Sequence, residues 1–226
     1  MELTQWRERI LLAPYEEERD RPILGYIQGD RYTLAVDAGH SSLHLQAFYE
    51  ALQKADKPLP DYTVLTHWHW DHSFALPWIH GISIANTETD KCLRELQKNM
   101  SPDYARQLMA MEPSIALEYA PGQEMKVSTA DLVFDGKLTV DLGGISAVLF
   151  RGVSPHTEDS TYILIPEEGV LFLGDAASGV YPHWRRDPLK ARQMIELLES
   201  IPFETAVSGH WQPQTKAELI RFIEEN

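Results

Sequence analysis

Short continuous apolar runs alternate along the chain with segments in which apolar residues recur every three or four positions. The runs predict buried strands, and the wider spacing predicts amphipathic helices. In the first half, two strands within residues 23–39 turn at Gly29-Asp30, a pair typical of a tight hairpin. Further strands are predicted at 62–66 and 82–86, and a helix at 42–55.

Helical spacing dominates residues 89–120, where Pro102 and Pro113 break the pattern into shorter helices. The second half returns to strands at 131–135, 137–143, 145–152, 160–166, 169–175 and 205–210, and to helices at 189–201 and 215–226. No repeat or long linker interrupts this succession. Residues 1–226 are therefore predicted to form a single α/β domain, in which helices are layered on sheets and residues 89–120 are a helical insert.

The composition narrows the function classes. With 34 acidic and 20 basic residues, the 226-residue chain has a formal net charge of -14. This charge disfavours a nucleic-acid partner, because phosphate binding calls for a basic surface. The single cysteine, Cys92, cannot form an intramolecular disulfide and is predicted as a partly buried structural thiol. The N-terminus lacks a signal-peptide core and no apolar run is long enough to cross a bilayer, so a cytoplasmic protein is expected.

Histidine and aspartate gather where the predicted strands end. One strand leads into THWHWDH (66–72) and three later strands lead to single candidates, so the set is His67, His69, Asp71, His72, His156, Asp175 and His210. Binding residues concentrate on loops held by such a scaffold, and imidazole and carboxylate are the ligands of zinc and related divalent ions. The chain therefore predicts a metal site.

Spacing within the first motif indicates two metal positions. In His-Trp-His, alternate residues project to one side of an extended loop, so His67 and His69 can reach one ion. Asp71 and His72 follow where the chain turns into a short helix, and they point to a second position nearby. Two neighbouring ions need a bridging group, for which Asp175 is the candidate.

These motifs resemble those of the metallo-β-lactamase superfamily. THWHWDH is similar to the family's H-x-H-x-D-H signature, while PHTEDST (155–161), LFLGD (171–175) and SGH (208–210) resemble its later motifs in the family's order. The resemblance spans about Gly25 to His210 and is of the glyoxalase II-like type. It implies a four-layer αββα sandwich of two mixed β-sheets flanked by helices.

The resemblance also implies a ligand set and a mechanism. One ion is expected on His67, His69 and His156 and the other on Asp71, His72 and His210, with Asp175 and a shared hydroxide between them. The two divalent ions are usually zinc in this family, and members with iron or manganese exist. A bound ion lowers the pKa of water from about 15.7 to roughly 7. The hydroxide then attacks an acyl carbonyl or a phosphorus, and Asp71 is expected to orient it as well as to bind metal.

Several sequence features indicate which branches of the superfamily the chain does not resemble. Ser73-Phe74 stands where many members have a residue and a glycine, and Pro155 and Asp159 stand where glycine is common. Asp175 argues against a class B1 or B2 β-lactamase, which carries cysteine there. The chain ends soon after His210, which disfavours the glutathione thioester hydrolases with their helical C-terminal domain. The acidic balance and the lack of an RNA-gripping arm disfavour the RNA-processing branch.

Aromatic-rich loops beside the motifs are candidates for substrate contact. The loop 178–188, SGVYPHWRRDP, offers Tyr181, His183, Trp184 and Arg185, and either Arg185 or Arg186 can hold a carboxylate or phosphate. The alternative is a surface loop with one or two rings packed inward. Trp70 and Trp211 adjoin predicted ligands and are further candidates for the pocket wall.

Other polar residues leave two interpretations open. Asp37 ends a strand, where it either holds a ligand histidine in place or is an ordinary turn aspartate. His40, His44 and His80 are expected to be ordinary surface or hydrogen-bonded histidines.

The sequence therefore predicts a binuclear metallohydrolase, zinc-dependent by expectation, that cleaves a small ester, thioester, lactone or phosphoester. Its expected partner is this small-molecule substrate, without nucleic acid or membrane. One alternative is a mononuclear iron enzyme similar to the persulfide dioxygenases, which share the implied fold and would use His67, His156 and Asp175. Another is a metal-binding protein without turnover. The substrate, the native metal and the formation of a homo-oligomer stay open.

Overall fold

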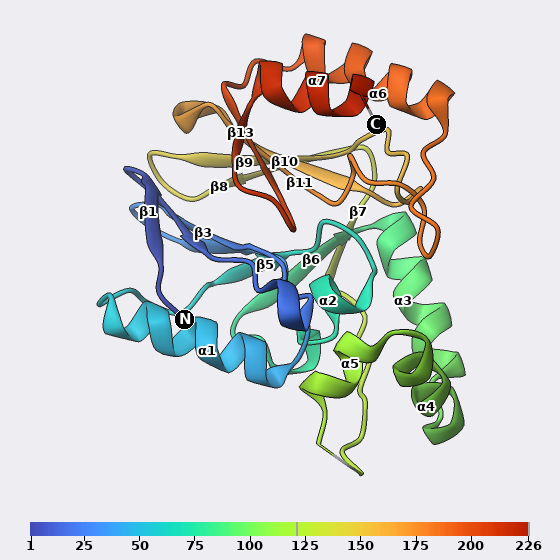
Figure 1. The fold of residues 1–226 in the computed structure, drawn as a ribbon. Helices are drawn as coiled ribbons and strands as arrows, with labels where there is room; N and C mark the ends of the chain where they lie inside the picture. Colours follow the sequence, from blue (N-terminus) through green and yellow to red (C-terminus); the bar gives the residue numbers. More distant parts are fainter. Residues whose placement is uncertain (121, 226) are drawn as a thin grey trace.

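Two β-sheets lie face to face and helices cover the outer face of each in the computed structural model, which describes residues 1–120 and 122–225 (Figure 1). This four-layer αββα sandwich confirms the fold expected from the sequence. Within the described residues, a seven-stranded sheet has the order β1-β2-β3-β4-β5-β6-β7, and a six-stranded sheet has the order β13-β12-β11-β10-β9-β8.

Each sheet is drawn from one half of the chain. The first comprises β1 (Thr4–Arg7), β2 (Ile10–Ala13), β3 (Leu24–Gln28), β4 (Thr33–Val36), β5 (Tyr62–Val64), β6 (Ile82–Asn86) and β7 (Leu132–Phe134). The second comprises β8 (Lys137–Asp141), β9 (Ser146–Arg151), β10 (Thr161–Ile165), β11 (Val170–Gly174), β12 (Thr205–Ser208) and β13 (Gln214–Thr215). Strands β4 to β7 pair in parallel, as do β11 and β12, and the other pairs are antiparallel.

The helices form the two outer layers. α1 (Ser42–Lys54) covers the first sheet, whereas α6 (Pro188–Ser200) and α7 (Lys216–Glu225) cover the second (Figure 1). The insert consists of α3 (Thr87–Asn99), α4 (Pro102–Met111) and α5 (Pro113–Glu118), and α3 packs beside β6 and β7. The remaining short helices are α2 (Trp70–Ser73) and the 3-10 turns η1 (Glu17–Arg19), η2 (Leu76–Trp78) and η3 (Pro166–Glu168). α4 and α5 begin at the prolines predicted to break the insert, because proline is favoured in the first turn of a helix.

The inner strands β2 to β4 and β10 to β12 are buried on both faces. Tyr26 and Ala35 pack in the layer that contains α1, whereas Ile27 and Leu34, from the same hairpin, pack between the two sheets. The second sheet follows the same rule, with a separate buried cluster under α6 and α7. Because helices and the opposite sheet cover both faces, these strands read as continuous apolar runs.

The N-terminal segment differs from the expectation. The apolar pattern indicated no strand within residues 1–20, yet β1 and β2 form an antiparallel hairpin there. β1 is an edge strand whose residues, Thr-Gln-Trp-Arg, are exposed or half-buried, and β2 is apolar and buried but only four residues long. The predicted strands and helices elsewhere are confirmed to within a few residues. Cys92 is half-buried in α3, and burial raises its pKa to about 11, in agreement with a structural thiol.

Parallel pairing brings several strand ends to one edge of the sandwich. Asp37 and His67 follow the parallel strands β4 and β5, and Asp175 and His210 follow β11 and β12. The two sheets approach closely there, since a Cβ added to Gly174 would lie 2.4 Å from Thr66 Oγ1. This edge is the place where the predicted ligands meet.

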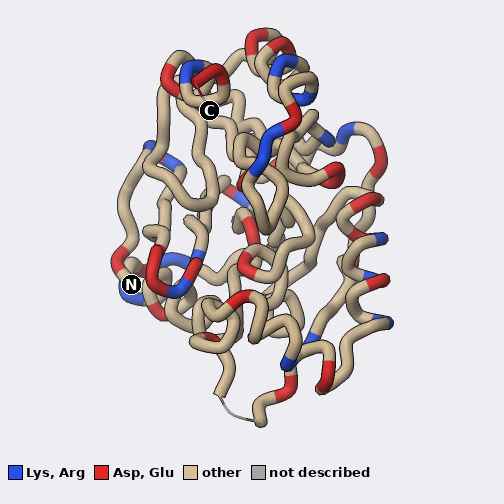
Figure 2. Tube along the Cα trace, turned by 45° about the vertical axis from the view of Figure 1, so that its right-hand side comes forward, with Lys and Arg blue, Asp and Glu red and all other residues tan. Residues whose placement is uncertain are grey.

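The charged residues do not form a single basic stripe. Figure 2 shows acidic and basic positions interspersed along the helices in the part of the chain that the structure describes. None of the described helices has the length and apolar character that crossing a membrane requires.

Candidate metal centre and substrate cavity

The loop between β5 and α2 carries four of the predicted ligands and is held rigidly. Ser73 Oγ donates to the carbonyl oxygens of Trp68 (2.7 Å) and His69 (2.9 Å). The Trp68 N–H donates to the buried carboxylate of Asp159 at 3.0 Å. Ser73 and Asp159 are two of the positions that depart from the expected motif, so these departures stabilise the loop rather than remove a ligand.

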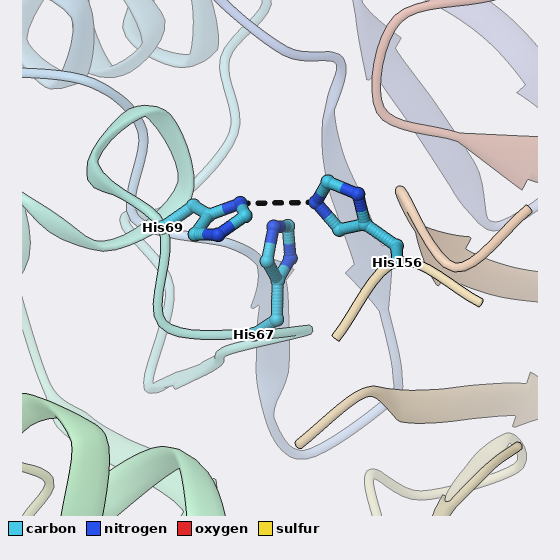
Figure 3. Close-up of side chains that lie close together, drawn as sticks. All are labelled: His67, His69 and His156. Carbon is cyan, nitrogen blue, oxygen red and sulfur yellow. Dashed lines mark hydrogen bonds between the residues drawn. The ribbon is translucent and has the colours of Figure 1, made fainter. Parts of the chain in front are cut away.

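His67, His69 and His156 form the first group. Figure 3 shows the three rings pointing toward one another, with His156 Nε2 2.9 Å from His69 Nδ1. His156 Nδ1 donates to the Gly179 carbonyl oxygen at 2.7 Å, which fixes the ring. Burial, and then the neighbouring imidazoles, lower the pKa of His67 well below its usual value and the pKa of His69 to about 3. Both rings are therefore neutral at pH 7, the state in which imidazole binds metal.

Asp71, His72, Asp175 and His210 form the second group. Asp71 Oδ2 lies 2.9 Å from His210 Nε2 and 3.0 Å from His72 Nε2. Burial disfavours the charged form of Asp71, but His72 and His210 outweigh burial and hold the pKa of Asp71 well below its usual value. Burial likewise disfavours charge on His210, yet Asp175 and Asp71 raise its pKa to about 9. The carboxylates of Asp71 and Asp175 therefore favour positive charge beside them.

Asp175 lies between the groups. Its Oδ2 is 3.4 Å from His210 Nε2 and 4.0 Å from His156 Nε2, and its Oδ1 is 3.5 Å from His72 Nε2. One carboxylate therefore reaches histidines of both groups, as a bridging ligand must.

Asp37 orients one histidine of each group, His72 directly and His67 through Thr66. Its Oδ2 accepts from His72 Nδ1 (2.7 Å) and Thr66 Oγ1 (2.9 Å), and its Oδ1 accepts from the Thr66 N–H (2.7 Å). Thr66 Oγ1 in turn lies 3.1 Å from His67 Nδ1. Of the two interpretations of Asp37, the structure therefore shows the one in which it holds a candidate ligand.

The donor set fits divalent cations. All candidate ligand atoms within each group lie within 4.8 Å of one another. His67 Nε2 and Asp175 Oδ1 are buried without a hydrogen-bond partner, a costly state that a bound cation removes. A Cβ added to Gly209 would lie 2.4 Å from Asp175 Oδ1, so packing around the second group requires glycine there. Imidazole and carboxylate oxygen are ligands suited to zinc.

A cavity of about 490 Å³ opens beside both groups. Its lining comprises Tyr15, Glu17, Asp20, His69, Trp70, Asp71, Asp175, Ser178, Gly179, Trp184, Arg186, His210 and Trp211. Three of the predicted substrate contacts, Trp70, Trp184 and Trp211, are among these residues. The cavity volume lies within the range of small-molecule sites, about 300–1,000 Å³.

The other predicted contacts lie farther out. Tyr181 packs edge-on against Trp70 and Trp184, with ring centroids 5.0 and 5.8 Å apart, but does not line the cavity. His183 and Arg185 are exposed and lie outside its lining, whereas the adjacent Arg186 lines it. The loop 178–188 is therefore partly a surface loop and partly an aromatic wall.

The N-terminal segment supplies a wall that the sequence analysis missed. Tyr15, Glu17 and Asp20 line the cavity, and Tyr15 lies edge-on to His210 at 6.0 Å. The only sequence signal was a run of charged residues after β2, which is usually an exposed surface. The three residues come near the metal centre through the tertiary fold alone.

A buried ion network fixes this wall. Glu118, at the end of α5, is fully buried and accepts from Arg21 Nε (2.9 Å) and Nη2 (3.0 Å). It also accepts from Arg19 Nη1 (3.0 Å) and from the hydroxyl of Ser41, which caps α1. Arg19 and Arg21 flank Asp20 in the chain, so the insert and α1 together position the N-terminal wall.

The remaining histidines divide into two kinds. His40 and His44 are fully buried, and the Nδ1 atoms of both are hydrogen-bonded, that of His40 to the Arg19 carbonyl at 3.0 Å. Burial lowers the pKa of His44 to about 3. His80 and His183 are exposed, as expected for surface histidines.

Comparison with known proteins agrees with this architecture. The family profile described as the metallo-beta-lactamase superfamily matches residues 25–210. Among curated proteins, none matches the sequence.

Solved structures share the fold at low sequence identity. A metallo-beta-lactamase from Pontibacter korlensis superposes with a TM-score of 0.69 at 14% identity, covering 100% of this chain and 99% of that one. The inverting sec-alkylsulfatase Pisa1 from Pseudomonas sp. gives 0.76 at 15% identity, covering 99% of this chain and 40% of that one. An archaeal superfamily protein from Sulfolobus tokodaii gives 0.64 at 20% identity, covering 97% and 86%.

Proposed function

The chain belongs to the metallo-beta-lactamase superfamily, and on that basis we propose that it is a metal-dependent hydrolase acting on a small ester, thioester, lactone or phosphoester. The observation that carries the proposal is the pair of adjoining buried groups of histidine and aspartate beside an aromatic-walled cavity. Such a cavity suits a partly apolar organic substrate.

The two groups would hold two divalent ions. His67, His69 and His156 would bind one, Asp71, His72 and His210 the other, and Asp175 would contact both. Zinc is the expected metal, and imidazole with carboxylate also suits iron or manganese. When bound, such ions act as Lewis acids that make water nucleophilic near pH 7 and polarise the substrate oxygen.

The chain's own residues would position the reactants. Asp71 lines the cavity, where its carboxylate can orient the attacking water through a hydrogen bond. The aromatic rings of Trp70, Trp184 and Trp211 would hold the organic part of the substrate. In the hydrolysis of an ester, the oxygen of water bonds to the acyl carbon, the bond to the leaving oxygen breaks, and the leaving oxygen receives a proton.

The arrangement favours this function over the mononuclear iron alternative. An iron on His67, His156 and Asp175 leaves Asp71, His72 and His210 without a cation, although these side chains lie within contact of one another. A buried carboxylate such as Asp71 is costly to keep without full compensation. A binuclear centre uses every residue of both groups.

Elemental analysis of the as-isolated protein, followed by a panel of acyl and phosphoryl esters in the same metal form, tests the proposal. We expect about two equivalents of zinc and hydrolysis of at least one substrate class. His69→Ala should abolish turnover and lower the metal content. His80→Ala, the same change at an exposed histidine, should alter neither. A fully loaded protein that is inert across the panel, or one that binds a single iron and cleaves no ester, would refute the proposal.

A further inference from the structure

The cavity has aromatic walls on two sides. Tyr15 and Trp211 flank His210, with ring centroids 6.0 and 6.5 Å from it. On the other side Trp184 stacks on His156 at 5.9 Å with an interplanar angle of 4°. Aromatic faces attract cations through their quadrupoles, tryptophan most strongly.

Two carboxylates beyond the metal-ligand groups line the same cavity. Glu17 and Asp20 belong to the N-terminal wall, and Asp20 Oδ1 lies 3.6 Å from His210 Nδ1. Glu17 and Asp20 follow Tyr15 closely in the chain and line the same cavity, so the phenol ring and the two acids belong to one wall. The tyrosine face and the two acids thus form one wall that suits positive charge.

Apart from the metal groups, few side chains bring positive charge to this cavity. Among the described residues that line the cavity, Arg186 is the sole lysine or arginine. Its guanidinium lies over the Phe222 ring, 4.5 Å from the centroid, and donates to the Phe222 carbonyl oxygen at 3.2 Å. A substrate with a carboxylate or phosphate tail would therefore meet two carboxylates and one guanidinium that already has partners.

Trp70 offers a hydrogen-bond donor, its indole N–H, that is independent of the acidic wall. It lines the cavity, is 6% exposed, and its ring stacks on His69 at 5.3 Å. Its indole N–H has no hydrogen-bond partner within the described residues. A buried donor without a partner favours a ligand with an acceptor oxygen there, close to His69 of the first metal group.

We propose that the substrate is a small carboxylic ester, thioester or lactone that carries an alkylammonium group, with the ammonium held by Tyr15, Glu17 and Asp20. This inference rests on the proposed hydrolase function and narrows it to a cationic acyl substrate. The acyl oxygen faces Trp70 and the metal groups, while the ammonium occupies the N-terminal wall. Phosphoesters, which the general proposal includes, are disfavoured because the acidic wall repels their negative charge.

Paired thioesters test the inference on the metal-loaded full chain. The probes are acetylthiocholine and S-(3,3-dimethylbutyl) thioacetate, which has carbon in place of the charged nitrogen. In both, the acyl C–S bond breaks, water oxygen bonds to the acyl carbon, and the released thiol is measured. We expect kcat/KM to favour the cationic probe by about tenfold, the combined effect of one cation–π contact and two carboxylates.

A charge reversal with a matched control distinguishes a local effect at the cavity wall from an effect of the protein's overall charge. Glu17→Lys should lower the ratio of kcat/KM for the cationic to the neutral probe by about fivefold or more. Glu18→Lys makes the same change at the adjacent exposed residue, which does not line the cavity, and should leave the ratio within about twofold. Equal effects of the two variants would overturn the inference, as would a native ratio near one.

A binding measurement keeps this test separate from that of the hydrolase function. Tetramethylammonium titrated into the metal-loaded protein should bind, and Glu17→Lys but not Glu18→Lys should weaken its binding. If the neutral probe is hydrolysed and tetramethylammonium does not bind, the hydrolase proposal holds and the cationic substrate is wrong. If tetramethylammonium binds through Glu17 but no ester in the panel is cleaved, the cation site holds and the hydrolase proposal fails.

Discussion

Asp37→Asn probes how the fold orients the candidate metal ligands. Position 37 has φ of 64°, a conformation that asparagine tolerates well, so the change alters chemistry more than backbone shape. The carboxylate accepts hydrogen bonds from the Thr66 N–H, the Thr66 hydroxyl and His72 Nδ1. An amide has one acceptor oxygen, so its NH2 group must face a donor in either orientation.

The magnitude follows from these contacts. Losing one hydrogen bond to a charged group costs about 1.5–3 kcal/mol, and the donor left buried adds roughly 1–3 kcal/mol. We expect about 3 kcal/mol of destabilisation, which for a chain of this size lowers Tm by roughly 6–12 °C. His72 also loses the acceptor that keeps its proton on Nδ1, so metal affinity should fall about 10–100-fold.

Thermal unfolding and chelator-competition titration of metal measure the two effects. Asp30→Asn is the matched control, because Asp30 is exposed and makes a surface ion pair with Arg9 at 2.8 Å. That variant should lose no more than about 1 kcal/mol and bind metal normally. If Asp37→Asn matches Asp30→Asn in both Tm and metal affinity, the orienting role of Asp37 is refuted.

Three further predictions concern packing, charge and the insert. Gly209→Ala should reduce bound metal by about one equivalent, because an added Cβ lies 2.4 Å from Asp175 Oδ1 and 2.8 Å from His72 Cε1. Elemental analysis measures this loss, and Gly136→Ala is the control because a Cβ added there has no other part of the chain within 4 Å. In the metal-free protein, the raised pKa of His210, about 9, gives stability that is full below pH 6.5 and is lost as the pH rises through 9. The metal-free Tm should therefore fall between about pH 7 and pH 9.5 and the metal-loaded Tm should fall much less; equal losses in scanning calorimetry would contradict the assigned charge balance. Glu118→Ala should cost about 3–5 kcal/mol in denaturant unfolding, because it leaves Arg21 buried without its main partner. Glu88→Ala, which removes an exposed pair with Lys91, should cost at most about 1 kcal/mol, and a Glu118→Ala loss as small as this would show that the buried network contributes little.

The sequence predicted what depends on local pattern. Strands covered on both faces left continuous apolar runs, and the motif around His67 and His69 placed two imidazoles on one side of a loop. These signals predicted helices layered on sheets and the residues that gather at one edge, whereas the four-layer sandwich was implied by the resemblance to the metallo-β-lactamase superfamily. The role of Asp37 stayed open because its hydrogen bonds to Thr66 and His72 cross from one strand end to another.

The cavity walls were less predictable. Arg185 and Arg186 are neighbours of the same type, yet only Arg186 lines the cavity, because the direction of each side chain is set by a loop in which Trp184 has φ of 53°. The pairing of Arg21 with Glu118 joins residues 97 positions apart and has no local signature. Tyr15, Glu17 and Asp20 follow a hairpin whose edge strand, β1, is polar and whose second strand, β2, has only four residues.

Through the ion network around Glu118, the helical insert affects the position of the N-terminal segment that lines the cavity. None of the described residues of α3, α4 or α5 lines the cavity, but α5 anchors the segment that does. Changes in this segment leave the candidate metal ligands in place, so under the proposed function substrate preference can change there without loss of a ligand. Divergence among descendants of this gene should therefore accumulate in the insert and the N-terminal hairpin together, as a co-varying pair.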